Sequence, residues 1–176
     1  MILEERLDKN KELRLTFLDI KAAFDNIDRK VIWEILENYN IDAKLTRAIK
    51  SVYNNVEGYV RIDREISKSV KMQRGIKQGE SLSPLLFIIV MNEIANRCTN
   101  KLNKVNIGMR NMEPVIIQHL IYADDIVLIT RNDRETQRAL DGRQEELGKV
   151  NLTINADKSK TMKIDKKHTP GNEIRM

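Results

Sequence analysis

Two adjacent carboxylates, Asp124 and Asp125, stand between two apolar runs that are rich in β-branched residues. Like charges so close together repel, and the repulsion grows where water is scarce. An exposed turn would solvate both groups, and acidic residues are common in turns. A hard divalent cation would also relieve the repulsion, because Mg²⁺ prefers carboxylate oxygens and keeps coordination positions free for phosphates. The pair therefore indicates either a solvated turn or part of a metal site.

A third carboxylate, Asp19, ends the segment 13–19, whose alternating and then apolar pattern predicts a β-strand. A side chain at a strand end is well placed to meet a hairpin turn on a neighbouring strand, although a surface or capping Asp gives the same pattern. Phe24 follows two alanines. It is interpreted either as a flat wall beside a ligand or as a core side chain.

A loop with two glycines and two cations precedes an expected helix N-terminus: Arg74, Gly75, Lys77 and Gly79. Free backbone N–H groups and the helix dipole favour anions at such a terminus. Gly79 would let a nucleotide approach the backbone closely, because glycine has no side chain. The loop lacks a Walker pattern. Its two cations and Gln78 are candidates to contact a nucleotide or a template strand.

Four helices are predicted around these groups. Asp28 is expected to cap the first and Asp42 the second, and a long third helix should run from about residue 83 to 102. Asp133 is expected to cap the fourth, which should end near residue 149. The inward-facing residues are Val31, Ile32, Ile35 and Leu36 in the first helix, Leu45, Ile49 and Val52 in the second, and the apolar run 85–91 in the third.

The β-type runs predict two hairpins. Residues 58–70 favour a hairpin with a polar turn at Asp63-Arg64, and residues 115–121 and 126–130 favour a tight hairpin with the acidic pair at its turn. Residues 152–154 and 161–164 are expected to form short closing strands. This order of elements predicts the α+β class, with an antiparallel sheet and helices packed on one face.

Composition favours an intracellular globular protein with a polyanionic partner. The 176 residues suffice for one domain with a core, and their net charge of +5 suits either a nucleic acid or a solvated basic face. The single cysteine, Cys98, excludes an internal disulfide and is expected to be buried, and His119 and His168 lack metal-ligand spacing. No apolar stretch approaches the ~20 residues of a transmembrane helix, so no membrane partner is expected.

Four segments, in this order, resemble the palm motifs of reverse transcriptases. Residues 17–25 are similar to motif A, the Gln-Gly pair with residues 83–87 to motif B, and Tyr122-Ala123-Asp124-Asp125 to motif C. Residues 152–160 resemble motif D, although Asn151 replaces the glycine that usually precedes it. The Ala-Phe-Asp ending of motif A and the form of motif C look most like the non-LTR, long-interspersed-element branch. The resemblance covers about residues 13–164.

The resemblance implies a polymerase palm with a ferredoxin-like core and a two-metal site. Asp19 and Asp124 would bridge two Mg²⁺ ions, with Mn²⁺ a possible substitute, and Asp125 would be the third carboxylate. The carbonyl of Ile20 would also reach one metal. One ion would activate a primer 3′-hydroxyl, and the other would hold the triphosphate and stabilise the leaving pyrophosphate. The reaction would add deoxynucleotides to a DNA primer on an RNA template.

The same resemblance assigns residues that bind the nucleotide and the nucleic acid. Phe24 would be the steric gate that crowds a ribose 2′-hydroxyl. Gln78 and Gly79 would line the nucleotide pocket, and Lys158 would neutralise or protonate pyrophosphate. The expected nucleic-acid contacts are Arg74, Lys77 and Tyr122. Action in the nucleus is expected from the family, although no localisation signal is visible.

Residues 13–165 are then expected to be a partial palm, between a charged segment 1–12 and a flexible tail 166–176. Most of the fingers and the thumb would belong to a longer polyprotein. The chain is thus either an active polymerase domain or an inactive remnant that keeps the palm fold and binds nucleic acid weakly at most. Other palm enzymes, such as nucleotidyl cyclases, carry a Gly-Gly-acidic-acidic-Phe turn that this chain lacks.

Overall fold

The computed structural model describes residues 12–99, 105–107 and 115–164, and the chain divides into two units. The first unit holds the chain up to Lys21 and from Met91 onward, and the second holds Ala22–Val90. The expected tail 166–176 and the expected charged segment 1–12, apart from its last residue, lie outside the described residues.

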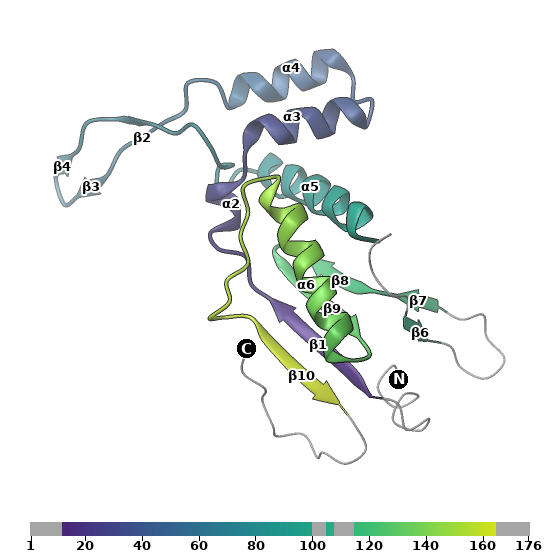
Figure 1. Cartoon of the computed structure of the whole chain (residues 1–176). Coiled ribbons are helices and arrows are strands. Elements are labelled where there is room, and N and C mark those ends of the chain that lie inside the picture. The colour runs from purple at the N-terminus through teal and green to yellow at the C-terminus, as the bar shows by residue number, and fades with distance from the viewer. Residues whose placement is uncertain (1–11, 100–104, 108–114, 165–176) are drawn as a thin grey trace. The chain divides into compact units, whose positions relative to one another are not determined.

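An antiparallel sheet of four strands forms the centre of the first unit, in the order β10-β1-β9-β8 (Figure 1). Leu18 of β1 stands opposite Ile126 of β9, and Leu13 stands opposite Ile164 of β10. The α+β class with an antiparallel sheet is therefore confirmed. The strands are β1 (Leu13–Leu18), β8 (His119–Tyr122), β9 (Asp125–Thr130) and β10 (Lys160–Ile164).

Helix α6 (Asp133–Gly148) covers one face of this sheet (Figure 1). Successive strand residues alternate between the two faces, and the buried Arg14, Thr16 and Leu18 lie on the α6 side. The opposite face, called the open face below, carries the large exposed side chains of three strands. These are Phe17, Leu120, Tyr122 and Met162.

The N-cap of α6 is Asn132, so the expected cap at Asp133 is wrong by one residue. The Asn132 side chain accepts a hydrogen bond from the backbone N–H of Glu135 at 2.9 Å. Asp133 instead receives two hydrogen bonds from the guanidinium of Arg14 on β1. Asn and Asp cap helices about equally well. The long-range ion pair with Arg14 therefore separates the role of Asp133 from that of the capping residue Asn132.

Two predicted strands differ from the structure. The run 115–121 is broken at Gln118 into β7 (Val115–Ile117), which pairs with β6 (Val105–Ile107), and β8. The carbonyl of Gln118 accepts a hydrogen bond from Ile129 at 3.0 Å, and its side chain donates to Thr99 at 3.2 Å. Residues 152–154 contribute a single bridge, from Ile154 to Ile20, rather than a strand.

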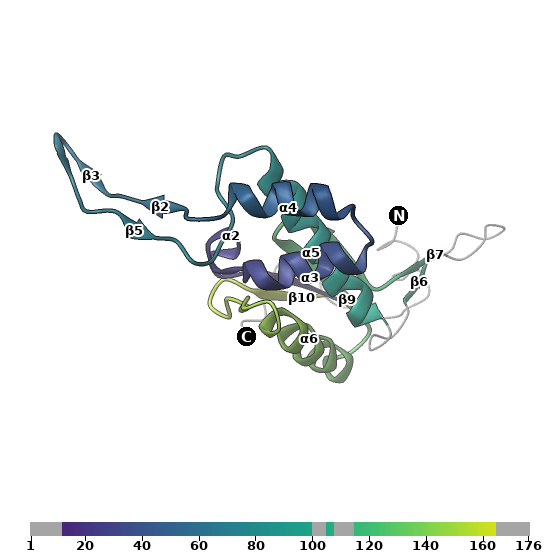
Figure 2. The ribbon, with the colours of Figure 1, turned by 90° about the horizontal axis from the view of Figure 1, so that it is seen from above.

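Two helices of the second unit begin at the predicted caps, Asp28 and Asp42. Its helices are α2 (Ala23–Asn26), α3 (Arg29–Asn38), α4 (Ala43–Val52) and the first part of α5 (Leu82–Thr99), and α3 and α4 lie side by side (Figure 2). The Asp28 carboxylate accepts from the N–H of Lys30 at 2.8 Å, and that of Asp42 accepts from the N–H of Lys44 at 2.8 Å. Both caps satisfy backbone donors that a helix start leaves without partners.

A two-stranded ribbon extends from the helices of the second unit (Figure 2). It confirms the predicted hairpin and its turn at Asp63-Arg64, because Ile62 pairs with Glu65 and Gly58 with Val70. Every residue from 61 to 70 is exposed. The four short strands of the ribbon are β2 (Glu57–Gly58), β3 (Arg61–Ile62), β4 (Glu65–Ile66) and β5 (Val70–Lys71).

The predicted inward face of α4 is wrong for two of its three residues. Ile49 is buried, but Leu45 is 53% exposed and Val52 is 39% exposed. The buried positions are Thr46, Ile49 and Tyr53, which recur at the three- and four-residue spacing of one helix face. Tyr53 can be buried on this face because its hydroxyl is hydrogen-bonded to Ser83 Oγ at 3.0 Å. A polar threonine and a tyrosine thus replace the expected aliphatic stripe.

The apolar run 85–91 in α5 is only partly a core segment. Leu85 and Ile88 are exposed, whereas Leu86, Phe87 and Val90 are buried. A continuous apolar run must direct some side chains outward, since a helix turns 3.6 residues per turn. The predicted end near residue 102 lies outside the described residues, and Cys98 is buried as expected. Among the described helices, none has both the length and the apolar character needed to cross a membrane.

Candidate active site

Asp19 and Asp125 lie at adjacent strand ends in the first unit. The pairing of β1 with β9 ends with Leu18 opposite Ile126, and Asp19 and Asp125 are the next residues along the two strands. Side chains at directly opposite positions point to the same face, and strand alternation places both carboxylates on the open face. Asp19 is half-buried and Asp125 is exposed. The backbone therefore brings the motif A and motif C carboxylates to one edge.

Asp124 lies in the two-residue turn between β8 and β9. Tyr122 pairs with Asp125, which leaves Ala123 and Asp124 as the turn. Ala123 has a φ of 53°, in a left-handed region that costs a residue with a Cβ about 1–2 kcal/mol. Glycine, asparagine or aspartate is usual at such turn positions. The strain is compatible with a functional role, since strained backbone tends to occur at functional sites.

Asp19 is held by the segment that follows α6. Asn155 donates from Nδ2 to Asp19 Oδ2 at 3.0 Å, and its backbone N–H donates to the Asp19 carbonyl at 2.8 Å. The N–H of Asp19 donates in turn to Ser159 Oγ at 3.1 Å, and this hydroxyl donates to the Asn155 carbonyl at 2.7 Å. These bonds fix both the backbone and the carboxylate of Asp19.

The carbonyl of Ile20 faces away from this segment. The bridge between Ile20 and Ile154 is flanked by hydrogen bonds from Lys21 to Thr153 and from Asn155 to Asp19. In an antiparallel ladder this pattern marks a pair whose own N–H and C=O groups point away from each other. The Ile20 carbonyl is therefore directed to the side of β1 on which β9 lies.

The three aspartates supply the oxygen donors that Mg²⁺ prefers. Within the described parts of the chain, no group of three or more His, Cys, Asp or Glu side chains is gathered closely enough to hold a metal ion. The register sets the strand ends side by side, while the carboxylates of Asp124 and Asp125 extend into solvent. A divalent cation would relieve the repulsion between neighbouring carboxylates. The chemistry of the donor set therefore fits a divalent ion.

Asn151 takes the left-handed conformation that glycine would adopt at the start of the motif D segment. Its φ is 62°, and asparagine is among the residues that tolerate this region. The turn is closed by hydrogen bonds from Asn151 to the Gly148 carbonyl and from Leu152 to the Leu147 carbonyl. The replacement of glycine by asparagine therefore preserves the turn.

In the second unit, Arg29 holds the loop that carries Gln78 and Gly79. Its guanidinium donates to the backbone carbonyls of Tyr53, Met72, Arg74 and Gly75 at 2.6 to 3.2 Å. Gly75 has a φ of 79°, and a Cβ on it would stand 2.6 Å from the carbonyl oxygen of Asp25. Only glycine therefore fits where the loop crosses the α2 segment.

Phe24 and the loop are also connected directly. The N–H of Ile76 donates to the Phe24 carbonyl at 2.7 Å, and Gln78 Nε2 donates to Asp25 Oδ1 at 3.3 Å. The half-buried ring of Phe24 stacks on Phe87 with a centroid distance of 4.7 Å and an interplanar angle of 18°. Motif A and motif B residues thus meet within this unit.

The remaining predicted contacts are solvent-facing. Gly79 has a φ of 85° and open space where a Cβ would stand. Lys77 is half-buried with its Nζ 5.8 Å from the ring centre of Tyr53, and Arg74 and Lys158 are exposed. Tyr122 is 84% exposed on the open face. The structure thus groups Asp19, Ile20, Tyr122, Asp124, Asp125 and Lys158 in the first unit, and Phe24, Arg74, Lys77, Gln78 and Gly79 in the second.

Sequence reasoning missed Asn155, Ser159 and Arg29. The first two lie inside the segment that resembles motif D, but the sequence did not predict their hydrogen bonds to Asp19. Arg29 follows the helix cap Asp28 and resembles any surface cation in sequence. Its burial, at 9% exposure, is visible only in the structure.

The chain is similar to polyproteins of mobile elements. It is 31% identical over 140 residues to the Pol polyprotein of the type-1 retrotransposable element R2 of Nasonia vitripennis, covering 80% of this chain and 13% of that protein. It is 29% identical over 160 residues to the RNA-directed DNA polymerase from mobile element jockey of Drosophila funebris, covering 88% and 16%. The chain therefore spans less than a fifth of these two relatives.

Solved structures of telomerase share the fold. The telomerase of Candida tropicalis in complex with a fragment of telomeric RNA superposes with a TM-score of 0.68 at 16% identity, over 91% of this chain and 28% of that one. Its apo form superposes with a TM-score of 0.65 at 18% identity, over 96% of this chain and 34% of that one. Residues 3–172 match the family described as reverse transcriptase (RNA-dependent DNA polymerase). The chain belongs to the reverse transcriptase family, with non-LTR retrotransposon proteins among its relatives.

Proposed function

We propose that this chain is the catalytic palm of an RNA-directed DNA polymerase that extends a DNA primer on an RNA template. The observation that carries the proposal is the register between β1 and β9, whose last pair, Leu18 and Ile126, leaves Asp19 and Asp125 as the next residues of two adjacent strands, beside the turn that holds Asp124. Carboxylates at strand ends held by main-chain hydrogen bonds suit chemistry that depends on positioning and charge stabilisation.

Asp19, Asp124 and Asp125 would hold two Mg²⁺ ions, or Mn²⁺ in their place, together with the carbonyl of Ile20. When bound, the two ions would activate the primer 3′-hydroxyl and stabilise the leaving pyrophosphate. Asn155 keeps one Asp19 oxygen engaged at 3.0 Å. It thereby leaves the other oxygen to a ligand and restricts the rotation of the carboxylate.

The second unit would supply the nucleotide pocket. Gln78 and Gly79 would line it, because the exposed loop presents Gly79 with no side chain to keep a nucleotide away. Phe24 would act as the steric gate against a ribose 2′-hydroxyl. Its stacking on Phe87 would hold the ring in position when a 2′-hydroxyl presses against it. In the first unit, the exposed Lys158 would neutralise pyrophosphate.

The open face is proposed to receive the primer and template. Exposed aromatic side chains such as Phe17 and Tyr122 present rings to solvent beside the acidic edge, where bases or sugars can pack on them. Arg74 and Lys77 would add contacts to phosphates. The longer relatives suggest that fingers and thumb segments of a polyprotein complete the binding site. Action in the nucleus is likewise proposed from the resemblance alone.

The alternative is an inactive remnant that keeps the palm fold. Primer extension on an RNA template, with Mg²⁺ or Mn²⁺, separates the two. The purified chain should be tested alone and within a longer protein that restores the flanking regions of an R2-type relative. Extension that disappears on Asp124→Asn supports the polymerase. If the longer protein folds and binds template but does not extend the primer, the result supports the inactive remnant.

A further inference from the structure

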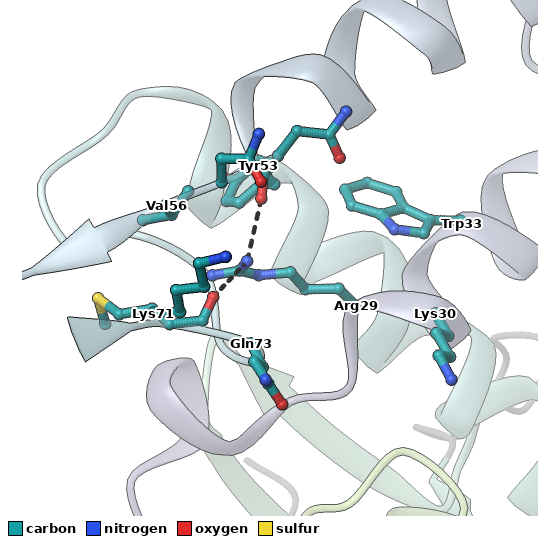
Figure 3. Close-up of a pocket in the computed structure, with 10 residues that line it drawn as sticks. Arg29, Lys30, Trp33, Tyr53, Val56, Lys71 and Gln73 are labelled. Atoms are coloured by element: carbon teal, nitrogen blue, oxygen red, sulfur yellow. Dashed lines mark hydrogen bonds between the residues drawn. The ribbon is translucent and has the colours of Figure 1, made fainter.

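A separate cavity of about 310 Å³ lies in the second unit, between α3, the end of α4 and the base of the ribbon (Figure 3). Its walls come from Arg29, Lys30 and Trp33 and from residues 53–56 and 71–73. None of the residues assigned above to metal, nucleotide or template lines it. Arg29, which holds the loop that carries Gln78 and Gly79, is part of its wall. Its volume is at the lower end of the range for small-ligand pockets.

The lining of this cavity is cationic. It includes Arg29, Lys30 and Lys71 and no acidic side chain; Glu57, which stands opposite Lys71 in the ribbon, is not part of it. Arg29 is committed to backbone carbonyls (Figure 3). Lys30 and Lys71 are exposed, and no ion pair joins either of them to another residue in the described part of the chain. The two ammonium groups lie on opposite sides of Arg29 (Figure 3), so each is available to a separate anionic group.

An aromatic corner forms one wall. The rings of Trp33 and Tyr53 are 5.8 Å apart with an interplanar angle of 53°. Tyr53 is fixed, because its hydroxyl bonds to Ser83 and the Arg29 guanidinium lies 5.4 Å from its ring centre. Trp33 is only half-buried, and its indole faces the cavity (Figure 3). A flat ligand can therefore stack on Trp33 without displacing the core.

Exposed amides complete the lining, from Asn54, Asn55 and Gln73. Each offers both hydrogen-bond donors and an acceptor, which matches the mixed edges of a nucleobase. Asn55 is in the left-handed conformation, with a φ of 54°, so the loop that presents Asn54 and Asn55 has a defined turn. Lysines for phosphate, an indole for a base and amides for its edge are thus combined in one cavity.

We propose that this cavity binds one unpaired nucleotide of a single-stranded nucleic acid, with the base on Trp33 and the phosphates on either side of that nucleotide at Lys30 and at Lys71. The proposal rests on the proposed function, since it supplies a guide for the strand outside the catalytic site. A paired base is stacked between its neighbours and presents no free face, so an unpaired one is required. The exposed Lys68 and Arg74 do not line the cavity. They are therefore expected to contribute little to the binding of this nucleotide.

Trp33 is the single tryptophan of the chain, so its fluorescence reports this cavity alone. The full chain should be titrated with short single-stranded RNA and, in a second arm, single-stranded DNA of the same sequence. Stacking is expected to quench the emission saturably, and a duplex of the same sequence should quench it much less. Deoxynucleoside triphosphate alone should quench it only at far higher concentration.

Matched charge reversals test the contacts. Lys71→Glu and Lys30→Glu should each weaken single-strand affinity about tenfold and lower the salt slope by roughly 1. Lys68→Glu, on the same ribbon but outside the cavity, should weaken it less than twofold. Circular dichroism and melting curves establish that each variant is folded, and all three replaced lysines are exposed.

Equal losses in Lys68→Glu and Lys71→Glu, or oligonucleotide binding by anisotropy without any change in Trp33 emission, would overturn the proposal. Asp124→Asn separates it from the proposed function. That variant should abolish primer extension and leave Trp33 quenching unchanged. Quenching by single strands, together with no primer extension even by the longer protein, would uphold the cavity and count against the polymerase.

Discussion

Asn155 binds Asp19 twice, through its side-chain amide at 3.0 Å and through its backbone N–H at 2.8 Å. The two residues are 136 positions apart in sequence. The contact joins the end of the motif A strand to the motif D segment and decides how the Asp19 carboxylate is oriented. Removing a group that orients a metal ligand in this way typically lowers metal affinity or activity by about 10- to 100-fold.

Asn155→Ala should lower primer extension roughly 10- to 100-fold while the backbone hydrogen bond keeps the segment in place. The loss should appear as a higher Mg²⁺ concentration for half-maximal activity, because the freed carboxylate must be ordered by the ion. Asn155→Asp offers a second arm. It should lower the melting temperature in chelator and regain it on addition of Mg²⁺, since the ion relieves the new repulsion. A melting temperature insensitive to Mg²⁺ in both variants would count against a metal at Asp19.

Asp124→Asn should abolish primer extension with little change in melting temperature. The side chain is exposed in a turn, so the fold does not depend on its charge, whereas the proposed metal site does. Calorimetric titration with Mn²⁺ measures the metal affinity directly. Asp141→Asn, which removes the same charge from an exposed site on α6, is the control and should retain both activity and Mn²⁺ binding. A large loss of stability in Asp124→Asn would instead indicate a structural role.

Gly75→Ala should destabilise the second unit by about 3 kcal/mol or more, because a positive φ and a clash with backbone carbonyls act together. Gly79→Ala has the positive φ without the clash and should cost about 1–2 kcal/mol. Gly148→Ala, at the end of α6 with open space around it, should be neutral or stabilising by up to about 1 kcal/mol. Urea unfolding of the three variants gives the ranking, and equal effects at Gly75 and Gly79 would contradict the close approach.

Acid should destabilise the first unit through His119. Burial, and secondly the charge of Arg143, lower the pKa of His119 from 6.5 to about 4. The pKa of His119 is lower in the folded state than in the unfolded state, so protonation favours unfolding. The free energy of unfolding is therefore unaffected by His119 above about pH 6.5 and decreases as the pH falls toward 4. The loss should be roughly 1–2 kcal/mol after solvent screening of the partly exposed ring. Urea unfolding at several pH values between these limits measures it.

His119→Leu should flatten this pH dependence. Arg143→Met should shrink it as well, because the pKa of His119 would rise toward its ordinary value. The guanidinium of Arg143 is fully buried without a hydrogen-bond partner in the described part of the chain, so its replacement should also raise stability above pH 7. An unchanged slope in His119→Leu would assign the acid sensitivity to other groups.

The sequence by itself determined the elements and the order of the chemical groups. Alternation predicted the strand that ends at Asp19, Asp28 and Asp42 marked the helix starts, and the acidic pair between apolar runs marked the hairpin. These signals are local, since a cap, a turn or a period of alternation involves residues a few positions apart. The family followed from the same segments and their order.

Tertiary structure alone decided which residues meet. Long-range partners chose between neighbours that are alike in sequence: Arg14 engages Asp133, so Asn132 becomes the cap, and Tyr53 with its bond to Ser83 turns the buried face of α4 away from Leu45. Asn155 and Arg29 carry no local signal, because their roles depend on Asp19 and on carbonyls brought to them by folding. The carboxylates Asp19, Asp124 and Asp125 were visible in the sequence, but the strand register that brings the ends of β1 and β9 side by side exists only once the sheet has formed.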